Sequence, residues 1–108
     1  MPYIQESERA KLDDCINALI ICIKATLKDK PFEVYELNND DMLNVAGKIN
    51  YIFSRVTASL MGKPSYAKVA IITGVLENIK QEFYRRVASP YEDAKIIENG
   101  DIKEYKNL

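Results

Sequence analysis

The longest periodic stretch of the sequence, "KPSYAKVAIITGVLENIKQEFYRRVAS", runs from Lys63 to Ser89 and decides the fold class. Its apolar residues recur at steps of three and four, which places their side chains on one face of an α-helix. They are Val69, Ile72, Leu76, Ile79, Phe83 and Val87. Ser65 directly follows Pro64, a pattern typical of a helix start. The stretch therefore predicts a long amphipathic helix that begins at Ser65.

The motif "SPYE" at the end of this stretch has the pattern of a second helix start. Ser89 fits the N-cap position, and Pro90 fits the first helical position. Glu92 lies three residues after the cap, where its side chain completes a capping box. We therefore predict a separate short helix that begins at Ser89 and ends at Asn99, because Gly100 is a favourable stop signal.

Two further amphipathic helices are predicted upstream. The first spans Ser7 to about Lys28, with Ser7 as its N-cap. The second begins with Asn39 or Asp40 as N-cap and ends at Gly62. Their apolar stripes are Leu12, Cys15, Ile16, Leu19, Ile20, Ile23 and Leu27 in the first helix, and Val45, Ile49, Ile52, Phe53, Val56 and Leu60 in the second.

These segments predict an all-α protein of three long helices plus a short C-terminal helix, in a single domain, 1–108, with 101–108 as a frayed tail. The segment 31–39 alternates apolar and polar residues, and we predict a loop there because one isolated strand has no pairing partner. A chain of 108 residues buries only roughly two thirds of its surface on folding. Apolar residues off the main stripes are Leu43, Ile71 and Val75. We therefore expect a homo-oligomer, a dimer or higher, that completes the helical bundle.

Two glycines fall inside predicted helices. Gly47 and Gly74 each cost about 1 kcal/mol relative to alanine at such positions. They therefore indicate that another helix or a ligand approaches the backbone closely at these points.

The bulk composition argues against two classes of partner. The net charge of −1 provides no electrostatic attraction for nucleic acid. No apolar run reaches the roughly 18 residues that a membrane span requires, and the start "MPYIQESERAKLDD" lacks the basic and apolar regions of a signal peptide. We expect a cytoplasmic protein that binds neither nucleic acid nor a membrane.

The residue types also limit the chemistry. The sequence has no histidine, and its two cysteines, Cys15 and Cys22, lie seven residues apart on a predicted helix, too far for a disulfide. Zinc sites and histidine-based acid–base catalysis are therefore excluded. We interpret both cysteines as small core residues, and we expect no catalytic residue, no metal and no cofactor.

Six blocks of the sequence resemble a small uncharacterised protein family that is common in phages, prophages and metagenomic bacterial sequences. The blocks are "MPYI", "INY", "GVLE", "EFYRR", "PYED" and "ENGD", and the C-terminal run is the most specific part. The resemblance covers most of the chain outside about 28–44. It implies a short, stand-alone, mostly helical protein of viral origin whose polar blocks belong to the family pattern, and no activity comes with it.

Polar and aromatic side chains gather outside the apolar stripes and form a candidate ligand-binding set. Its members are Asn50, Tyr51, Arg55, Glu77, Lys80, Tyr84, Arg85, Arg86, Tyr91, Glu92 and Asp93. In a pocket, a tyrosine would stack on a base, an arginine would bind phosphate, and a carboxylate or amide would fix a hydroxyl or amine. In the alternative interpretation, the tyrosines pack at a helix junction and the arginines pair with neighbouring carboxylates.

The functional hypothesis is a non-enzymatic, phage-type binding protein. It would act as an anti-defence sponge for a small anionic, nucleotide-derived immune signal of cyclic nucleotide or ADP-ribose type, in the cytoplasm of an infected or lysogenic bacterial host. The alternative is a homo-oligomeric adaptor or inhibitor of a host protein. A magnesium-dependent nucleotide pyrophosphohydrolase is a remote third option, because Glu77 and Glu82 diverge by about 140° around a helix and lack the paired spacing that such enzymes need.

Overall fold

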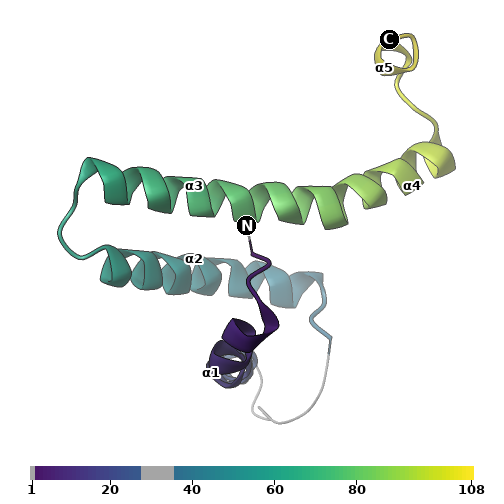
Figure 1. Cartoon of the computed structure of the whole chain (residues 1–108). Coiled ribbons are helices and arrows are strands. Elements are labelled where there is room, and N and C mark those ends of the chain that lie inside the picture. The colour runs from purple at the N-terminus through teal and green to yellow at the C-terminus, as the bar shows by residue number, and fades with distance from the viewer. Residues whose placement is uncertain (1, 28–35) are drawn as a thin grey trace. The chain divides into compact units, whose positions relative to one another are not determined.

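The computed structural model describes residues 2–27 and 36–108, and every regular element in these ranges is a helix (Figure 1). The chain is all-α, with three long helices and a short C-terminal helix, as predicted. It divides into two compact units, which are described separately. The N-terminal unit is Tyr3–Ser65, and the C-terminal unit contains Tyr66–Leu108. The single domain with a frayed tail stays a prediction.

The N-terminal unit consists of α1 (Glu6–Ala25) and α2 (Asn39–Met61). Helix α1 begins one residue before the predicted Ser7, and Gln5 is its N-cap without a side-chain cap bond. Its predicted end at Lys28 lies outside the described residues. So does most of the segment 31–39 that the sequence predicted to be a loop, and the described residues 36–38 have no regular structure.

Helix α2 has well-defined ends. Asn38 caps its start: the Asp41 N–H donates to the Asn38 side chain at 2.8 Å, and the Asn38 N–H donates to the Asp41 carboxylate at 3.1 Å. This capping box begins one residue before the predicted N-cap. Gly62 ends the helix as predicted, with a positive φ of 62° that glycine adopts without strain.

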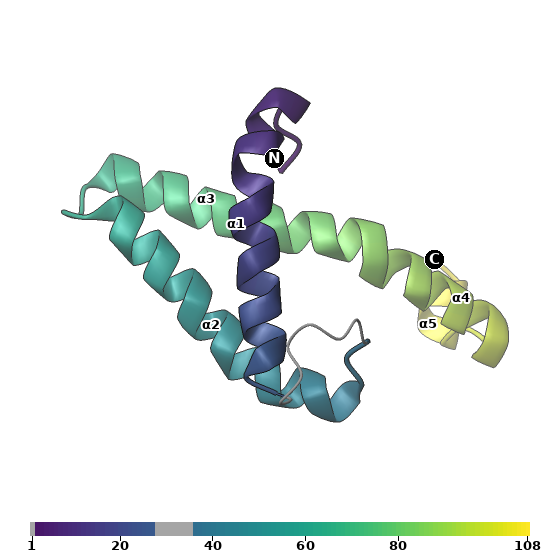
Figure 2. The ribbon, with the colours of Figure 1, turned by 90° about the horizontal axis from the view of Figure 1, so that it is seen from below.

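Helix α1 crosses α2, with the C-terminal end of α1 against the N-terminal half of α2 (Figure 2). At this crossing the Lys48 ammonium donates a hydrogen bond of 2.8 Å to the Thr26 hydroxyl. Val45 of α2 is 1% exposed and is the only buried side chain among the residues that the structure describes. The α1–α2 contact is therefore narrow.

In the C-terminal unit, α3 (Tyr66–Phe83), the π-helical turn η1 (Tyr84–Ala88) and α4 (Ser89–Asn99) follow one another without a break. The ribbon in Figure 1 runs continuously from α3 into α4. Gly100, with φ of 87°, ends α4 as predicted. A single helical turn, α5 (Lys103–Lys106), follows.

Helix α4 has the predicted bounds, but the prediction that Ser89 is its N-cap is wrong. Ser89 has helical backbone angles, and its N–H donates to the Tyr84 carbonyl five residues earlier, so the helix continues through this point. Pro90 explains the wider turn. Its ring lacks an N–H and crowds the carbonyl four residues before it, and a π turn directly upstream provides room for the ring. The motif "SPYE" therefore marks a proline inside a long helix.

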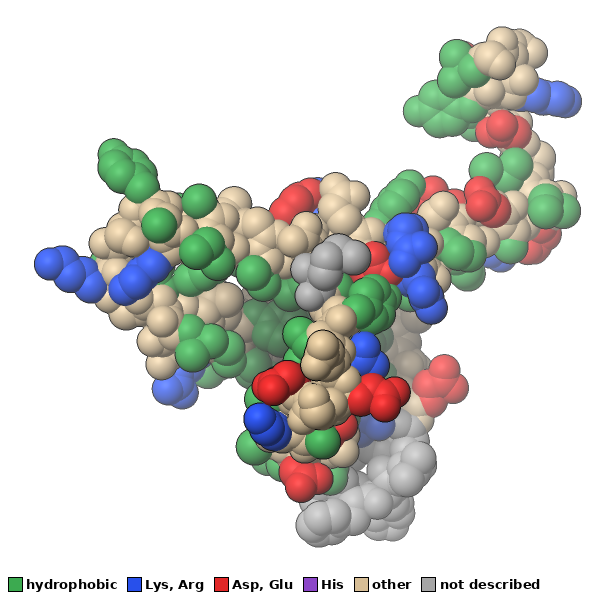
Figure 3. Space-filling view, viewed as in Figure 1, with side chains coloured by type: hydrophobic (Ala, Val, Ile, Leu, Met, Phe, Trp, Pro, Cys, Tyr) green, Lys and Arg blue, Asp and Glu red, His purple; other side chains and the backbone are tan. Residues whose placement is uncertain are grey.

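Most of the predicted apolar stripes are exposed within the chain. Leu76 is 43% exposed and Phe83 is 63% exposed, and hydrophobic side chains lie open on the surface in Figure 3. The prediction that Cys15 and Cys22 are core residues is wrong for the isolated chain, because both thiols are free and exposed. Within the N-terminal unit, the narrow crossing of α1 and α2 does not cover the apolar stripes of these two helices.

Candidate ligand groove

The predicted ligand-binding residues fall in both compact units. Asn50, Tyr51 and Arg55 lie on α2 of the N-terminal unit. The other eight lie along the continuous helix of the C-terminal unit, and they are Glu77, Lys80, Tyr84, Arg85, Arg86, Tyr91, Glu92 and Asp93. That these two sets meet in one pocket stays a prediction.

Most of the C-terminal set pairs with neighbours on its own helix. The Gln81 amide donates to the Glu77 carboxylate at 2.9 Å, and the Lys80 ammonium lies 3.5 Å from the same carboxylate. The Arg85 guanidinium binds the Glu82 carboxylate through two nitrogens, with Nε at 3.2 Å. The pairs at Glu77 join exposed side chains three and four residues apart, and such pairs contribute little to stability. In the Arg85–Glu82 pair, the Glu82 side chain is only 14% exposed.

The pairing around Glu77 also sets its acidity. The hydrogen bond from Gln81 and then the positive charge of Lys80 stabilise the carboxylate, and they lower the pKa of Glu77 below its ordinary value of 4.5. A carboxylate held ionised in this way does not serve as a general acid near neutral pH.

The aromatic members of the C-terminal set are also engaged with neighbours. The Tyr84 hydroxyl donates to the Glu92 carboxylate at 3.3 Å, and the Lys95 ammonium lies 5.6 Å from the centre of the Tyr91 ring. Arg86 and Asp93 are exposed on the same helix. The bond between Arg85 and Glu82 is one of the arginine–carboxylate pairs expected if these residues form a helix junction and not a ligand pocket.

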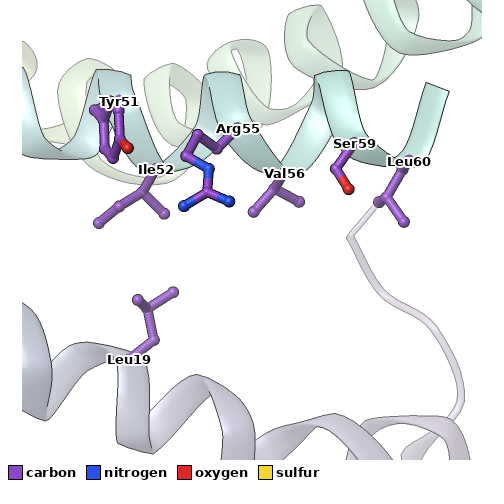
Figure 4. A pocket seen from close by; sticks show the side chains of 7 residues that line it. All are labelled: Leu19, Tyr51, Ile52, Arg55, Val56, Ser59 and Leu60. Carbon is purple, nitrogen blue, oxygen red and sulfur yellow. The ribbon is translucent and has the colours of Figure 1, made fainter. Parts of the chain in front are cut away.

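The N-terminal unit contains an open groove between α1 and α2. Its wider part has a volume of about 460 Å³ and is lined by Leu19, Tyr51, Ile52, Arg55, Val56, Ser59 and Leu60. Figure 4 shows the α2 side chains directed toward α1, with Leu19 facing them across the groove. The Arg55 guanidinium carbon lies 6.0 Å from the centre of the Tyr51 ring. A cation and an aromatic face therefore stand side by side at the groove wall.

The groove continues toward the C-terminal end of α1. This second part has a volume of about 350 Å³ and shares Leu19, Tyr51 and Ile52 with the first. Its other lining residues are Cys22, Ile23, Thr26, Gly47 and Lys48. A methyl group added at Gly47 would meet nothing within 4 Å, so the backbone of α2 is open to approach at this point.

The charges along the two parts of the groove all have one sign. Arg55 is the charged residue of the first lining and Lys48 is the charged residue of the second. Neither lining contains a carboxylate. This is notable in a chain whose net charge is −1. Among the described lining residues, an anion entering the groove would meet two cations and no carboxylate.

The comparisons with known proteins identify a family. A family model described as "Domain of unknown function (DUF6899)" matches residues 1–102. The chain belongs to this family. No curated protein and no solved structure matches the chain.

In this member of the DUF6899 family, sequence reasoning found two groove residues and missed others. Tyr51 and Arg55 were predicted, whereas Asn50 does not line the groove. Lys48 and Ser59 were missed. Their spacing was a usable signal, because Lys48, Tyr51, Arg55 and Ser59 follow one another at steps of three and four along α2.

Within 2–27 and 36–108, no group of three or more Cys, Asp or Glu side chains is placed to hold a metal ion. No described helix has both the length and the apolar character needed to cross a membrane.

Proposed function

We propose that the protein is a non-enzymatic binding protein that takes up a small anionic, nucleotide-derived ligand in the α1–α2 groove. The observation that carries this proposal is the lining: Arg55 beside the Tyr51 ring, a second cation at Lys48, and no carboxylate. The ligand class is the one expected from the sequence, and its contacts would all lie on the N-terminal unit.

Each groove residue suits one part of such a ligand. The Arg55 guanidinium can form two parallel hydrogen bonds to a phosphate, a geometry that lysine lacks. The Tyr51 ring offers a face for base stacking, worth roughly 1–3 kcal/mol per base. Apolar side chains of Leu19 and Ile52 contribute contacts to the uncharged body of the ligand.

Lys48 and Gly47 suit the narrower part of the groove. The Lys48 ammonium bonds to the Thr26 hydroxyl at 2.8 Å, and a second phosphate would compete for that ammonium. Gly47 leaves the α2 backbone accessible there, so a ligand group could approach where a side chain would otherwise stand. A ligand with two separated phosphates would therefore use both parts of the groove.

Binding without turnover matches a sequestering role. A protein that removes a signalling molecule from solution needs affinity and abundance, and no catalytic group. In a virus-encoded protein, the target would be a nucleotide-derived immune signal of the bacterial host, of cyclic nucleotide or ADP-ribose type. This role extends the binding proposal and depends on it.

The test is a ligand screen with recovery of the ligand. The purified protein is incubated with cyclic dinucleotides and ADP-ribose derivatives, and the melting temperature is recorded. A ligand at 100 times its Kd stabilises the folded state by about 2.7 kcal/mol, which for a small domain raises the melting temperature by roughly 10 °C or more. Heat denaturation should then release the ligand chemically unchanged. A converted product would contradict the non-enzymatic proposal.

Matched variants locate the site. Arg55→Met and Tyr51→Leu should abolish the thermal shift while the helical content stays constant. Tyr66→Leu, at a side chain that is 98% exposed on α3, should leave the shift intact. If Arg86→Met abolishes the shift and Arg55→Met does not, the site lies on the C-terminal unit and the groove proposal is wrong.

A second candidate function is an adaptor or inhibitor that binds a host protein. The exposure of large apolar side chains favours it: Leu43 is 77% exposed, Leu60 is 82% exposed and Ile97 is 86% exposed. Surfaces of this kind often mark protein interaction sites. The absence of a thermal shift with every ligand of the screen would favour this function over ligand binding.

A further inference from the structure

The continuous helix of the C-terminal unit carries an apolar seam with coiled-coil spacing. From Val69 to Phe83 the steps are three, four, three and four residues, the heptad pattern in which two helices pack side by side. The seam consists of Val69, Ile72, Leu76, Ile79, Phe83, Val87 and Tyr91. No second long helix belongs to this unit. The seam residue Ile79 is 49% exposed and Val87 is 51% exposed.

The π turn keeps this seam continuous. A strict heptad repeat would continue from Phe83 to position 86, but the next apolar residue is Val87, one residue later. This additional residue falls within η1 (Tyr84–Ala88), where a wider turn accommodates more residues than an α-helical turn. Val87 and Tyr91 can therefore lie on the same face as the five residues before them. The seam then extends for about 30 Å at 1.5 Å per residue.

The charges along the seam differ between its two halves. Its midpoint lies at about residue 80. Residues 63–80 carry three lysines and one glutamate, a net charge of +2, whereas residues 81–99 carry three cations and four carboxylates, a net charge of −1. Two parallel copies would place like charges together, while two antiparallel copies would place each positive half beside a negative half.

We propose that a second copy of this chain covers the seam, in an antiparallel pair of α3–η1–α4 helices related by twofold symmetry. The apolar spacing fits an identical helix, and the charge distribution complements itself only in the antiparallel orientation. Flanking apolar residues such as Val75, which is 47% exposed, widen the contact toward the roughly 800 Å² per partner of a standard interface. The inference is independent of the ligand groove, which lies on the other unit.

Sedimentation equilibrium over a range of concentrations tests the pairing. The wild-type protein should dimerise. Ile79→Asp places a charge in the seam and should raise the dimer Kd at least about tenfold. Ala70→Asp is the control, because Ala70 is exposed on the same helix on the side away from the seam, and its Kd should change less than about twofold. A monomeric wild type, or equal effects of the two variants, overturns the proposal.

The orientation is tested by distance measurement, which does not depend on a destabilising variant. Single spin labels are attached at Asn78→Cys or Tyr66→Cys after Cys15 and Cys22 are replaced by alanine. In the antiparallel pair, the Asn78 labels lie close together near the midpoint, whereas the Tyr66 labels are separated by about 42 Å along the helix axis. A short Tyr66 distance would show a parallel pair and overturn the antiparallel arrangement.

Discussion

The Tyr84 hydroxyl donates a hydrogen bond of 3.3 Å to the Glu92 carboxylate, eight residues further along the same helix. In an uninterrupted α-helix, residues eight apart point about 80° away from each other. The π turn between them takes up this difference, so the two side chains meet on one side of the helix. The bond is therefore a local consequence of the turn that precedes Pro90.

The proline inside the helix can be tested by replacement. Pro90→Ala restores a backbone N–H and removes the crowding of the preceding turn, so the free energy of unfolding should rise by about 1–3 kcal/mol. Urea denaturation measures this change. If Pro90 stood at the first position of a separate helix, where proline is favourable, the variant would gain nothing or lose stability.

Asn38 and Ser89 both resemble N-caps in sequence, but replacing them should affect the free energy of unfolding differently. Asn38→Ala removes an observed capping box and should lower the free energy of unfolding by about 1 kcal/mol. Ser89→Ala should change it by less than about 0.5 kcal/mol, because the N-cap of α4 is Ala88, so Ser89 stands inside the helix, where alanine is the better helix former. Thermal denaturation of the two variants side by side provides the comparison. A loss of about 1 kcal/mol for Ser89→Ala would restore the separate-helix interpretation.

Alanine substitutions at the two helical glycines should have the same effect on stability and different effects on ligand binding. An added methyl meets nothing within 4 Å at Gly47 or Gly74, so either change to alanine should stabilise the free protein by about 1 kcal/mol. Gly47 lines the groove and Gly74 does not. Gly47→Ala should therefore weaken binding of any ligand found in the screen, and Gly74→Ala should leave its Kd unchanged. Equal Kd values for both variants would place the ligand away from the narrow part of the groove.

The acidity of Glu77 provides a pH-dependent prediction. Its pKa is lower in the folded chain than the ordinary value of 4.5, so its contribution to stability is present above that value and is lost as the pH falls through the folded-state pKa. Gln81→Leu should raise this pKa more than Lys80→Met does, because the Gln81 hydrogen bond is the larger cause. A carbon-detected NMR titration of the Glu77 carboxyl measures both. No increase in Gln81→Leu would contradict the hydrogen bond.

The helices were predictable from sequence because their periodicity and end signals are local. Gly62 and Gly100 end their helices as predicted, since both adopt positive φ values. The motif at Ser89 gave an incorrect N-cap prediction, because the same residues fit both a helix start and a π turn before proline. Only the backbone hydrogen bonds distinguish the two. The groove was only half predictable. The spacing of Tyr51 and Arg55 is local, but the opposing Leu19 comes from another helix, and helical periodicity does not specify which helices face each other.

The groove also contains a chemical reporter. Cys22 lines its narrow part, Cys15 does not, and both thiols are free and exposed. The two cysteines therefore form an internal pair in which one alkylation rate follows groove occupancy and the other serves as the reference. The same thiol offers an anchor for disulfide tethering, through which small fragments that bind too weakly for a thermal screen can be trapped beside Tyr51 and Lys48.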